Sequence, residues 1–296
     1  MTAETDDETL RRLAEAKQEH GQLLRPVELF GKLLQLQVDV RSKVKVAVSP
    51  QGLTKEAIEE RLKNRESILE FGGLALDWAL VQELIKAAAQ TVAEYTSSNS
   101  EGAGGVESIT SSTFPLHQAV EAWYQGSSLA PTALAHSVSE GFLHSVILVA
   151  LQPFLKAYSQ ELIGSVNQKQ WRRRFCPVCG GQADFAFLDK ESGARWLLCS
   201  RCDSQWLFQR LECPYCGNTE QKTLAYFTDG TELYRLYVCE ECKSYIKAID
   251  LRKTESDVLL PLERIVTSDL DRQAREKGYM SGVTPTIPFE EIGGSC

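Results

Sequence analysis

The N-terminal part of the chain repeats apolar residues at helical spacing. Apolar positions three or four residues apart fall on one face of a helix. The predicted helices cover residues 7–19, 26–38, 54–69, 74–95, 116–124 and 132–158. Pro26 suits the first turn of the second helix and Thr54 the N-cap of the third, whereas Pro153 should kink or break the last. Residues 96–105 are rich in Ser and Gly, which predicts a flexible linker between two helical layers.

Beyond residue 170 the pattern changes to short apolar runs that are typical of strands. The runs cover 185–187 and 196–198 in one unit, then 226–227 and 233–238 in the next. Turn residues separate the two runs of each unit, so each unit predicts a hairpin. Residues 245–250 alternate as a further short strand, 259–274 have helical spacing, and 278–296 predict an irregular tail.

Cysteine pairs bracket both hairpins. Eight of the nine cysteines form four Cys-x-x-Cys pairs: Cys176/Cys179, Cys199/Cys202, Cys213/Cys216 and Cys239/Cys242. Two intervening residues allow one tight turn to point both sulfurs at one tetrahedral metal ion. In the first and third pairs, proline fixes φ after the first cysteine, and glycine after the second can adopt a left-handed conformation. The second and fourth pairs have neither.

Folding each hairpin brings its two cysteine pairs together. The sequence therefore predicts two mononuclear sites, each with four thiolates. Site 1 is formed by Cys176, Cys179, Cys199 and Cys202; site 2 is formed by Cys213, Cys216, Cys239 and Cys242. An interleaved arrangement, in which the first pair joins the third and the second joins the fourth, remains open.

Other uses of these cysteines are weaker alternatives. Structural disulfides need an oxidising compartment, and no secretory signal is apparent. A single Cys-x-x-Cys is often a redox dithiol, so a dithiol redox protein is one alternative. Four pairs in two repeated units, without a flanking βαβ pattern, favour metal. Four thiolates suit either zinc or a single iron ion, and the ligand type does not choose between them.

Composition narrows the class of protein. The chain has 296 residues, which is enough length for about two domains. Its formal net charge of −8 argues against general nucleic-acid binding. The most apolar stretch, 142–155, is short and contains His144 and Gln152, so no membrane-spanning segment is predicted. We expect a soluble cytoplasmic protein.

Several other features carry weaker signals. The basic run 172–174 and five aromatic residues leave a zinc-ribbon nucleic-acid-binding protein open as an alternative. The aromatic residues are Trp196, Trp206, Tyr215, Tyr234 and Tyr237. His136 and His144 are interpreted as core or surface residues, and Cys296 as an incidental thiol. No catalytic array is apparent and a four-thiolate ion has no open coordination position, so an enzyme is not expected.

Four motifs carry the cysteine pairs in order. They are Arg174-Phe175-Cys176-Pro-Val-Cys179-Gly180, Trp196-Leu-Leu-Cys199-Ser-Arg-Cys202, Leu211-Glu-Cys213-Pro-Tyr-Cys216-Gly217 and Tyr237-Val-Cys239-Glu-Glu-Cys242-Lys243. Across residues 170–252 these motifs resemble the FdhE family, the formate dehydrogenase accessory proteins. The helical N-terminal half is compatible with that family but carries no motif of it.

The resemblance implies a chaperone-like cytoplasmic protein that assists maturation of formate dehydrogenase. It implies a helical region, two rubredoxin-like modules, and binding of the immature molybdenum- or tungsten-containing catalytic subunit. It also moves the expected metal from zinc toward iron without deciding between them. No catalytic residue is implied.

The sequence thus predicts an α+β protein. A mainly helical N-terminal domain is followed by two tandem rubredoxin-like or zinc-ribbon modules and a C-terminal helical tail. The predicted boundaries are 1–165, with a split into two subdomains near 97–113 left open, then 170–210, 211–252 and 253–296. A homodimer is also left open, because exposed faces of the helix at 74–95 could serve self-association as easily as client binding.

Overall fold

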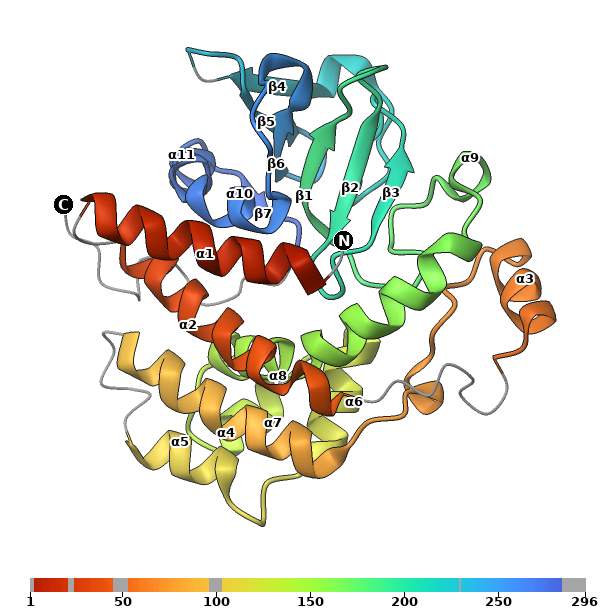
Figure 1. Ribbon diagram of the computed structural model, residues 1–296. Helices are drawn as coiled ribbons and strands as arrows, with labels where there is room; N and C mark the ends of the chain where they lie inside the picture. The colour runs from red at the N-terminus through yellow and green to blue at the C-terminus, as the bar shows by residue number, and fades with distance from the viewer. Residues whose placement is uncertain (1–2, 21–23, 45–52, 96–102, 229, 284–296) are drawn as a thin grey trace. The chain divides into compact units, whose positions relative to one another are not determined.

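A computed structural model of the protein divides the chain into two compact units. It describes residues 3–20, 24–44, 53–95, 103–228 and 230–283 (Figure 1). The helical unit comprises the described residues of Thr2–Pro50 and Phe71–Ala157, and the sheet unit those of Gln51–Glu70 and Tyr158–Val283. The predicted α+β class is confirmed.

Amphipathic helices build the helical unit. They are α1 (Ala3–His20), α2 (Arg25–Val40), α4 (Trp78–Tyr95), α5 (Ala103–Thr110), α6 (Leu116–Gln125), α7 (Ala130–Ala135) and most of α8 (Glu140–Leu162), with short 3-10 turns at η1 (Arg41–Lys43) and η2 (Phe71–Gly73). Helix α2 packs against α1 and α4, and α4 packs against α5. The apolar face of α4 is fully buried at Val81, Ala88 and Val92, which explains why this face recurs at helical spacing in the sequence.

The helices predicted at 26–38, 74–95 and 116–124 are confirmed, with shifted ends. Helix α4 begins at Trp78 rather than at residue 74, because Asp77 Oδ1 accepts hydrogen bonds from the Ala79 and Leu80 N–H groups and caps the helix there. The predicted linker 96–105 was wrong at its end, since α5 already begins at Ala103. Residues 96–102 lie outside the described residues.

The helix predicted at 132–158 is two helices. Helix α7 ends at Ala135 and α8 begins at Glu140, whose carboxylate accepts the Leu129 and Ala130 N–H groups at 2.6 and 3.0 Å. Pro153 lies inside α8 without ending it.

The α8 segment is longer than the sequence reading of 142–155 suggested. Glu140–Ser165 spans 26 residues at a hydropathy of 1.3, so by length and composition alone it could cross a membrane. Within the protein, however, 72% of its most apolar window is buried, as expected of a core helix in a soluble protein.

Seven strands form one sheet in the sheet unit. They are β1 (Ala183–Leu188), β2 (Arg195–Cys199), β3 (Gln205–Phe208), β4 (Leu224–Thr228), β5 (Tyr234–Cys239), β6 (Ser244–Asp250) and β7 (Met280–Ser281). The spatial order is β3-β2-β1-β6-β5-β4, and β7 pairs with β6. Strands β1–β3 form the first cysteine-bearing ribbon and β4–β6 form the second. Each ribbon therefore has one strand more than the predicted hairpin. The sequence analysis found β6 but missed β3.

The two ribbons join side by side. Within each ribbon the strands are antiparallel, whereas β1 and β6 are parallel, with Phe185 beside Lys247 and Leu188 beside Asp250. One sheet thus continues through both ribbons. We propose that the predicted domain boundary between residues 210 and 211 separates two repeats of one sheet and not two independent sheets.

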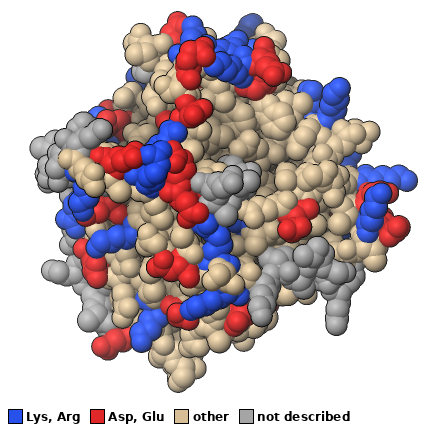
Figure 2. Space-filling model, viewed as in Figure 1, with Lys and Arg blue, Asp and Glu red and all other residues tan. Residues whose placement is uncertain are grey.

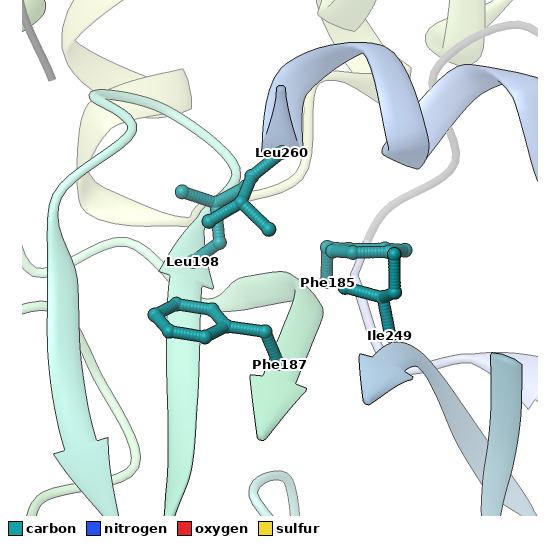
Figure 3. Close-up of a cluster of buried hydrophobic side chains, with 5 residues drawn as sticks. All are labelled: Phe185, Phe187, Leu198, Ile249 and Leu260. Atoms are coloured by element: carbon teal, nitrogen blue, oxygen red, sulfur yellow. The ribbon is translucent and has the colours of Figure 1, made fainter. Parts of the chain in front are cut away.

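One apolar cluster of the sheet unit gathers side chains from both ribbons. Phe185, Phe187 and Leu198 come from the first ribbon, Ile249 from the second, and Leu260 from helix α10 (Leu260–Val266) (Figure 3). The helix predicted at 259–274 is interrupted at Thr267, after which α11 (Ser268–Glu276) continues. The tail predicted at 278–296 is not wholly irregular, because the Met280 N–H donates to the Lys243 carbonyl where β7 pairs with β6. Residues 284–296 lie outside the described residues.

Residues 51–70 cluster with the sheet unit, although the sequence places them among the N-terminal helices. Thr54 caps α3 (Lys55–Lys63) as predicted, by accepting the Ala57 N–H at 3.2 Å. The helix ends at Lys63, so the prediction that it extends to Ile68 and Leu69 was wrong. The N–H groups of those two residues instead donate to the carbonyls of the first cysteine turn, at Pro177 (2.8 Å) and Val178 (2.9 Å).

Candidate metal centres

Four cysteines of the first ribbon converge on one point. Site 1 gathers Cys176, Cys179, Cys199 and Cys202, whose sulfurs all lie within 4.8 Å of one another. The Cys176 and Cys202 sulfurs are 3.6 Å apart, and those of Cys179 and Cys199 are 3.5 Å apart. The first pair therefore meets the second pair directly, without interleaving.

Site 2 repeats this arrangement in the second ribbon. Its members Cys213, Cys216, Cys239 and Cys242 also lie within 4.8 Å of one another. The distance from the Cys213 sulfur to that of Cys242 is 3.7 Å, as is the distance from Cys216 to Cys239. All eight cysteines are free thiols.

The same turn holds each first pair. The Cys176 N–H donates to the Gly181 carbonyl at 2.8 Å, and the Cys213 N–H donates to the Asn218 carbonyl at the same distance. The glycine after the second cysteine has positive φ in both turns, +73° at Gly180 and +80° at Gly217. Glycine adopts this left-handed conformation without a steric penalty, as the sequence predicted.

The turns that lack glycine adopt the same conformation. Asp203 and Lys243, which follow the second cysteine of each later pair, have φ values of +56° and +54°. A residue other than glycine in this region carries a conformational cost, so the surrounding contacts must stabilise it. From the absence of Pro and Gly, these two turns were predicted to be looser than the Cys-Pro-x-Cys-Gly turns.

Site 1 is enclosed. All four of its cysteines are buried, and the Gly181 and Arg201 N–H groups donate to the sulfurs of Cys179 and Cys199, each at 3.4 Å. The Ser204 hydroxyl contacts the Cys202 sulfur at 3.1 Å and the Ser159 hydroxyl at 2.6 Å. These polar groups can stabilise negative charge on sulfur in a place without water.

Helix α10 adds a buried cation beside site 1. Arg264 Nη2 lies 3.0 Å from Asp184 Oδ1 and donates to the Cys199 carbonyl, and Nη1 donates to Asp203 at 3.0 Å. Burial works against the Arg264 cation, but the two aspartates outweigh it and raise the pKa of Arg264. The Asp203 contact also stabilises the left-handed turn after Cys202.

Site 2 is open to water on one side. Cys213 and Cys239 are buried, but Cys242 is half-buried and Cys216 is exposed. The Asn218 amide donates to the Cys239 sulfur at 3.6 Å. Burial opposes ionisation of Cys239, but the Cys242 N–H and the Asn218 amide outweigh it and lower the pKa of Cys239 to about 7.

Thiol ionisation is opposed at both sites, and at site 2 burial raises the pKa of Cys213 and of Cys216. The thiols of Cys176, Cys199 and Cys202, together with burial, raise the pKa of Cys179 well above its ordinary value. Four buried thiolates would repel one another unless a cation lay between them. Site 1 therefore needs a positive ion to hold its ligands in the ionised form.

The sulfur positions fit a tetrahedral ion. With metal–sulfur bonds of about 2.3 Å, the sulfurs of a regular tetrahedron lie roughly 3.8 Å apart. The four closest cross-pair separations, 3.5 to 3.7 Å, are close to this value. Each group of four cysteines could hold one ion, and these sulfurs would suit zinc or iron alike.

Several of the groups that suggested nucleic-acid binding have structural partners. Arg174 donates to the Tyr215 carbonyl at 2.6 Å, and the Arg173 carbonyl accepts the Trp206 indole N–H at 2.7 Å. Trp206 is buried, and the Tyr215 and Tyr234 hydroxyls donate to Ala183 and Glu263. Figure 2 shows Lys and Arg interspersed with Asp and Glu over the face that it draws.

The remaining candidates of the sequence analysis lie elsewhere. His136 hydrogen-bonds the Ser108 hydroxyl at 2.8 Å and His144 packs near Trp123, which agrees with their interpretation as core or surface residues. Cys296 lies outside the described residues.

Three groups near the sites were missed. Ser204 and Asn218 each follow a cysteine pair by two residues, so their position in the sequence could have suggested hydrogen bonding to sulfur. The whole second ribbon separates Arg264 from Cys202 in the sequence, so no local signal could have placed Arg264 beside site 1.

The comparisons with known proteins all match proteins that are named FdhE. Residues 175–210 match the family model described as FdhE, central domain. A relative from Aquifex aeolicus named "Protein FdhE homolog" is 36% identical over 157 residues, covering 52% of this chain and 54% of that protein. A relative of the same name from Shewanella oneidensis is 27% identical over 173 residues, covering 53% and 55%. The chain thus spans about half the length of the curated relatives it matches.

A solved structure has a similar fold. It is described as the crystal structure of the FdhE protein from Pseudomonas aeruginosa and matches with a TM-score of 0.59 at 21% identity. The match covers 96% of this chain and 93% of that one. It therefore extends the likeness in fold beyond the cysteine-rich region.

Proposed function

From its place in the FdhE family, which the central-domain match, the relatives and the fold support together, we propose that this chain is a formate dehydrogenase accessory protein. In this proposal it binds the immature molybdenum- or tungsten-containing catalytic subunit in the cytoplasm and has no enzymatic activity of its own. The observation that carries the proposal is the pair of four-cysteine sites, the first of which lies within the residues 175–210 that match the family model.

Metal in these sites would act on structure. Cys176, Cys179, Cys199 and Cys202 would hold one iron or zinc ion, and Cys213, Cys216, Cys239 and Cys242 the other. An ion bound by four thiolates has no open position for water or substrate, so it would cross-link the turns and not activate a reactant. Small ribbons often require such a cross-link to fold.

The chain's own residues would then supply a fixed recognition surface. Arg264 joins α10 to Asp184 of β1, to the Cys199 carbonyl of β2 and to Asp203 in the second cysteine turn. The parallel pairing of β1 with β6 joins the two ribbons. Metal binding in either site would therefore order one continuous sheet. Neither the structure nor the comparisons supports the homodimer that the sequence left open.

The test is whether the catalytic subunit requires this chain. We expect deletion of the gene in the host to abolish most formate dehydrogenase activity, and the tagged chain to co-purify the catalytic subunit from cells blocked in cofactor synthesis. A variant with Cys176→Ser and Cys199→Ser should lose both properties, whereas Cys296→Ser should retain them.

Metal content of the anaerobically purified chain would identify the ion, by elemental analysis and by the visible absorption of iron–thiolate bonds. Full formate dehydrogenase activity in the deletion strain would contradict the proposal.

A further inference from the structure

The two outer edges of the sheet differ. At one edge, the Leu207 N–H of β3 donates to the side-chain oxygen of Gln168 at 3.1 Å, and helix α9 (Gln168–Trp171) packs against this strand. At the other edge, β4 pairs only with β5 among the strands that the structure describes (Figure 1). Proteins usually cover or blunt a sheet edge because its unpaired backbone groups attract another strand. The described part of the chain thus covers one edge of the sheet and leaves the other open.

Strand β4 has the composition of a pairing surface. Its sequence is Leu-Ala-Tyr-Phe-Thr, and its last four residues are exposed. Tyr226 is 52% exposed and Phe227 is 41% exposed, although aromatic residues of this size are usually more buried. Adjacent residues of a strand point to opposite faces, so the edge offers one aromatic ring on each face.

The register shows which backbone groups point outward. The Glu240 N–H donates to the Thr223 carbonyl at 2.9 Å, which makes Thr223 and Glu240 a hydrogen-bonded pair just before β4. Such pairs alternate along antiparallel strands. Ala225 and Phe227 therefore bond to β5, while the N–H and C=O groups of Leu224, Tyr226 and Thr228 face away from the sheet.

Cations without ion-pair partners surround this edge. The Lys277 ammonium lies 4.9 Å from the centre of the Phe227 ring. Lys222 is exposed two residues before β4, and the exposed Arg210 lines the same small depression, about 30 Å³, as Leu224 and Ala225. Among the described residues, none of these three cations forms an ion pair. Glu232, Glu240 and Glu276 each form one, whereas Glu212 in the same depression and Glu220 beside Lys222 do not.

We propose that the open edge of β4 binds an extended acidic and apolar peptide of a partner protein by adding it to the sheet as a further strand. Three outward residues of β4 would bond the peptide backbone. Apolar side chains of the peptide would lie against Tyr226 and Phe227, and its carboxylates near Arg210, Lys222 and Lys277.

A second copy of this chain fits the edge less well. Stable interfaces between folded proteins bury roughly 800 Å² on each partner, far more than a five-residue strand edge provides. Pairing of two β4 edges would also bring the same cations together. The inference deepens the proposed function, because the peptide would be a segment of the client.

The backbone part of the proposal can be tested at one position. Tyr226→Pro and Tyr226→Thr both remove the ring, but only proline removes the outward N–H, and neither affects the bonds of Ala225 and Phe227 to β5. The probe is a fluorescein-labelled nine-residue peptide of alternating valine and threonine with an aspartate at each end, and its anisotropy is measured with the full chain.

We expect the peptide to bind the Tyr226→Thr variant within a fewfold of the natural chain, and the Tyr226→Pro variant at least tenfold more weakly. The double variant Lys222→Glu with Lys277→Glu should weaken binding at least fivefold. Metal content and circular dichroism of every variant must match those of the natural chain.

Three results would overturn the proposal. The first is equal binding by the proline and threonine variants, and the second is equal binding of a peptide with lysines in place of the aspartates. The third is a dimer of the natural chain, in sedimentation, that dissociates in the proline variant. Co-purification of the formate dehydrogenase subunit by the proline variant would refute the surface alone and leave the proposed function standing.

Discussion

The two four-cysteine sites are built from the same turns but meet water differently. Site 1 has four buried cysteines, covered by the backbone of residues 68–69, the hydroxyls of Ser159 and Ser204, and Arg264. Site 2 exposes Cys216 and half-exposes Cys242. The repeat thus yields one enclosed site and one accessible site.

The difference comes from the segments that follow or precede the ribbons. Site 1 receives contacts from Ile68 and Leu69, which follow α3, and from Ser159 in the last turn of α8, all N-terminal to the ribbons. It also receives a contact from Arg264 of α10, on their C-terminal side. Site 2 receives β7, whose Met280 N–H bonds the carbonyl of Lys243 beside Cys242. We interpret site 1 as part of the core of the sheet unit and site 2 as part of its surface.

The largest effect should come from removing one ligand of each site. Cys199→Ser should release the metal of site 1 and unfold the first ribbon, since a structural ion contributes on the order of 10 kcal/mol in small ribbons. Cys216→Ser removes an exposed ligand and should leave site 1 filled and the first ribbon folded. Each variant should lose about one metal ion per chain, so calorimetric unfolding is the measurement that separates them.

Cys296→Ser is the matched control for loss of a thiol outside the two sites. It should change neither the metal content per chain nor the unfolding temperature. An equal loss of unfolding temperature in Cys199→Ser and Cys216→Ser would contradict the comparison, because the two sites would then contribute equally to the fold.

The next effect concerns the cation beside site 1. Arg264→Met removes the cation that pairs with the buried Asp203 and the partly buried Asp184, and we expect a loss of about 3–5 kcal/mol in the free energy of unfolding. Arg264→Lys keeps the charge but cannot reach both carboxylates and the Cys199 carbonyl, so it should lose less. Urea unfolding measures both.

Arg272 provides the control on α11. It pairs with Asp269 and Glu276 at the exposed surface, and such pairs contribute about 0–1 kcal/mol. Arg272→Met should therefore have little effect on stability. A loss as large as that of Arg264→Met would show that charge on the C-terminal helices, and not the cover of site 1, matters.

These contrasts also show what the sequence could reveal. The four Cys-x-x-Cys pairs and the two Cys-Pro-x-Cys-Gly turns predicted which cysteines converge, because this information lies within a few neighbouring residues. The left-handed conformations of Asp203 and Lys243 were not predicted, since nothing in their type requires positive φ. Contacts made after folding impose it.

The unequal burial of the sites could not be predicted at all. Both repeats have the same spacing, and the groups that cover site 1 come from distant segments such as Arg264 and Ser159. The same limit explains β3, whose four residues follow the second turn without a clear alternation. Strand β4, by contrast, was visible as an aromatic run, but only the sheet order shows that it is an edge.

A smaller effect should appear in thiol reactivity. Attack by an alkylating reagent requires an accessible thiolate, so Cys216 should be modified before any cysteine of site 1. We expect at least about a tenfold difference in rate, measured by mass spectrometry of iodoacetamide adducts while metal is withdrawn slowly by a chelator. First modification at Cys176 or Cys199 would reverse our assignment of the accessible site.

The smallest effect concerns single hydrogen bonds to sulfur. The Asn218 amide donates to Cys239 at the open site, so Asn218→Ala should weaken metal retention at site 2 by about 1 kcal/mol, or roughly fivefold. Asn218→Asp places a carboxylate near the same sulfur and should weaken it further, because like charges repel. The measurement is the rate at which a chelator removes metal from site 2.

Ser204→Ala is the equivalent change at site 1, where it removes the hydroxyl near the Cys202 sulfur. If access to water controls metal release, this variant should leave the slow release from site 1 almost unchanged, since the remaining cover still excludes the chelator. If Ser204→Ala instead accelerates release as much as Asn218→Ala does, hydrogen bonds to sulfur and not burial would set the difference between the two sites.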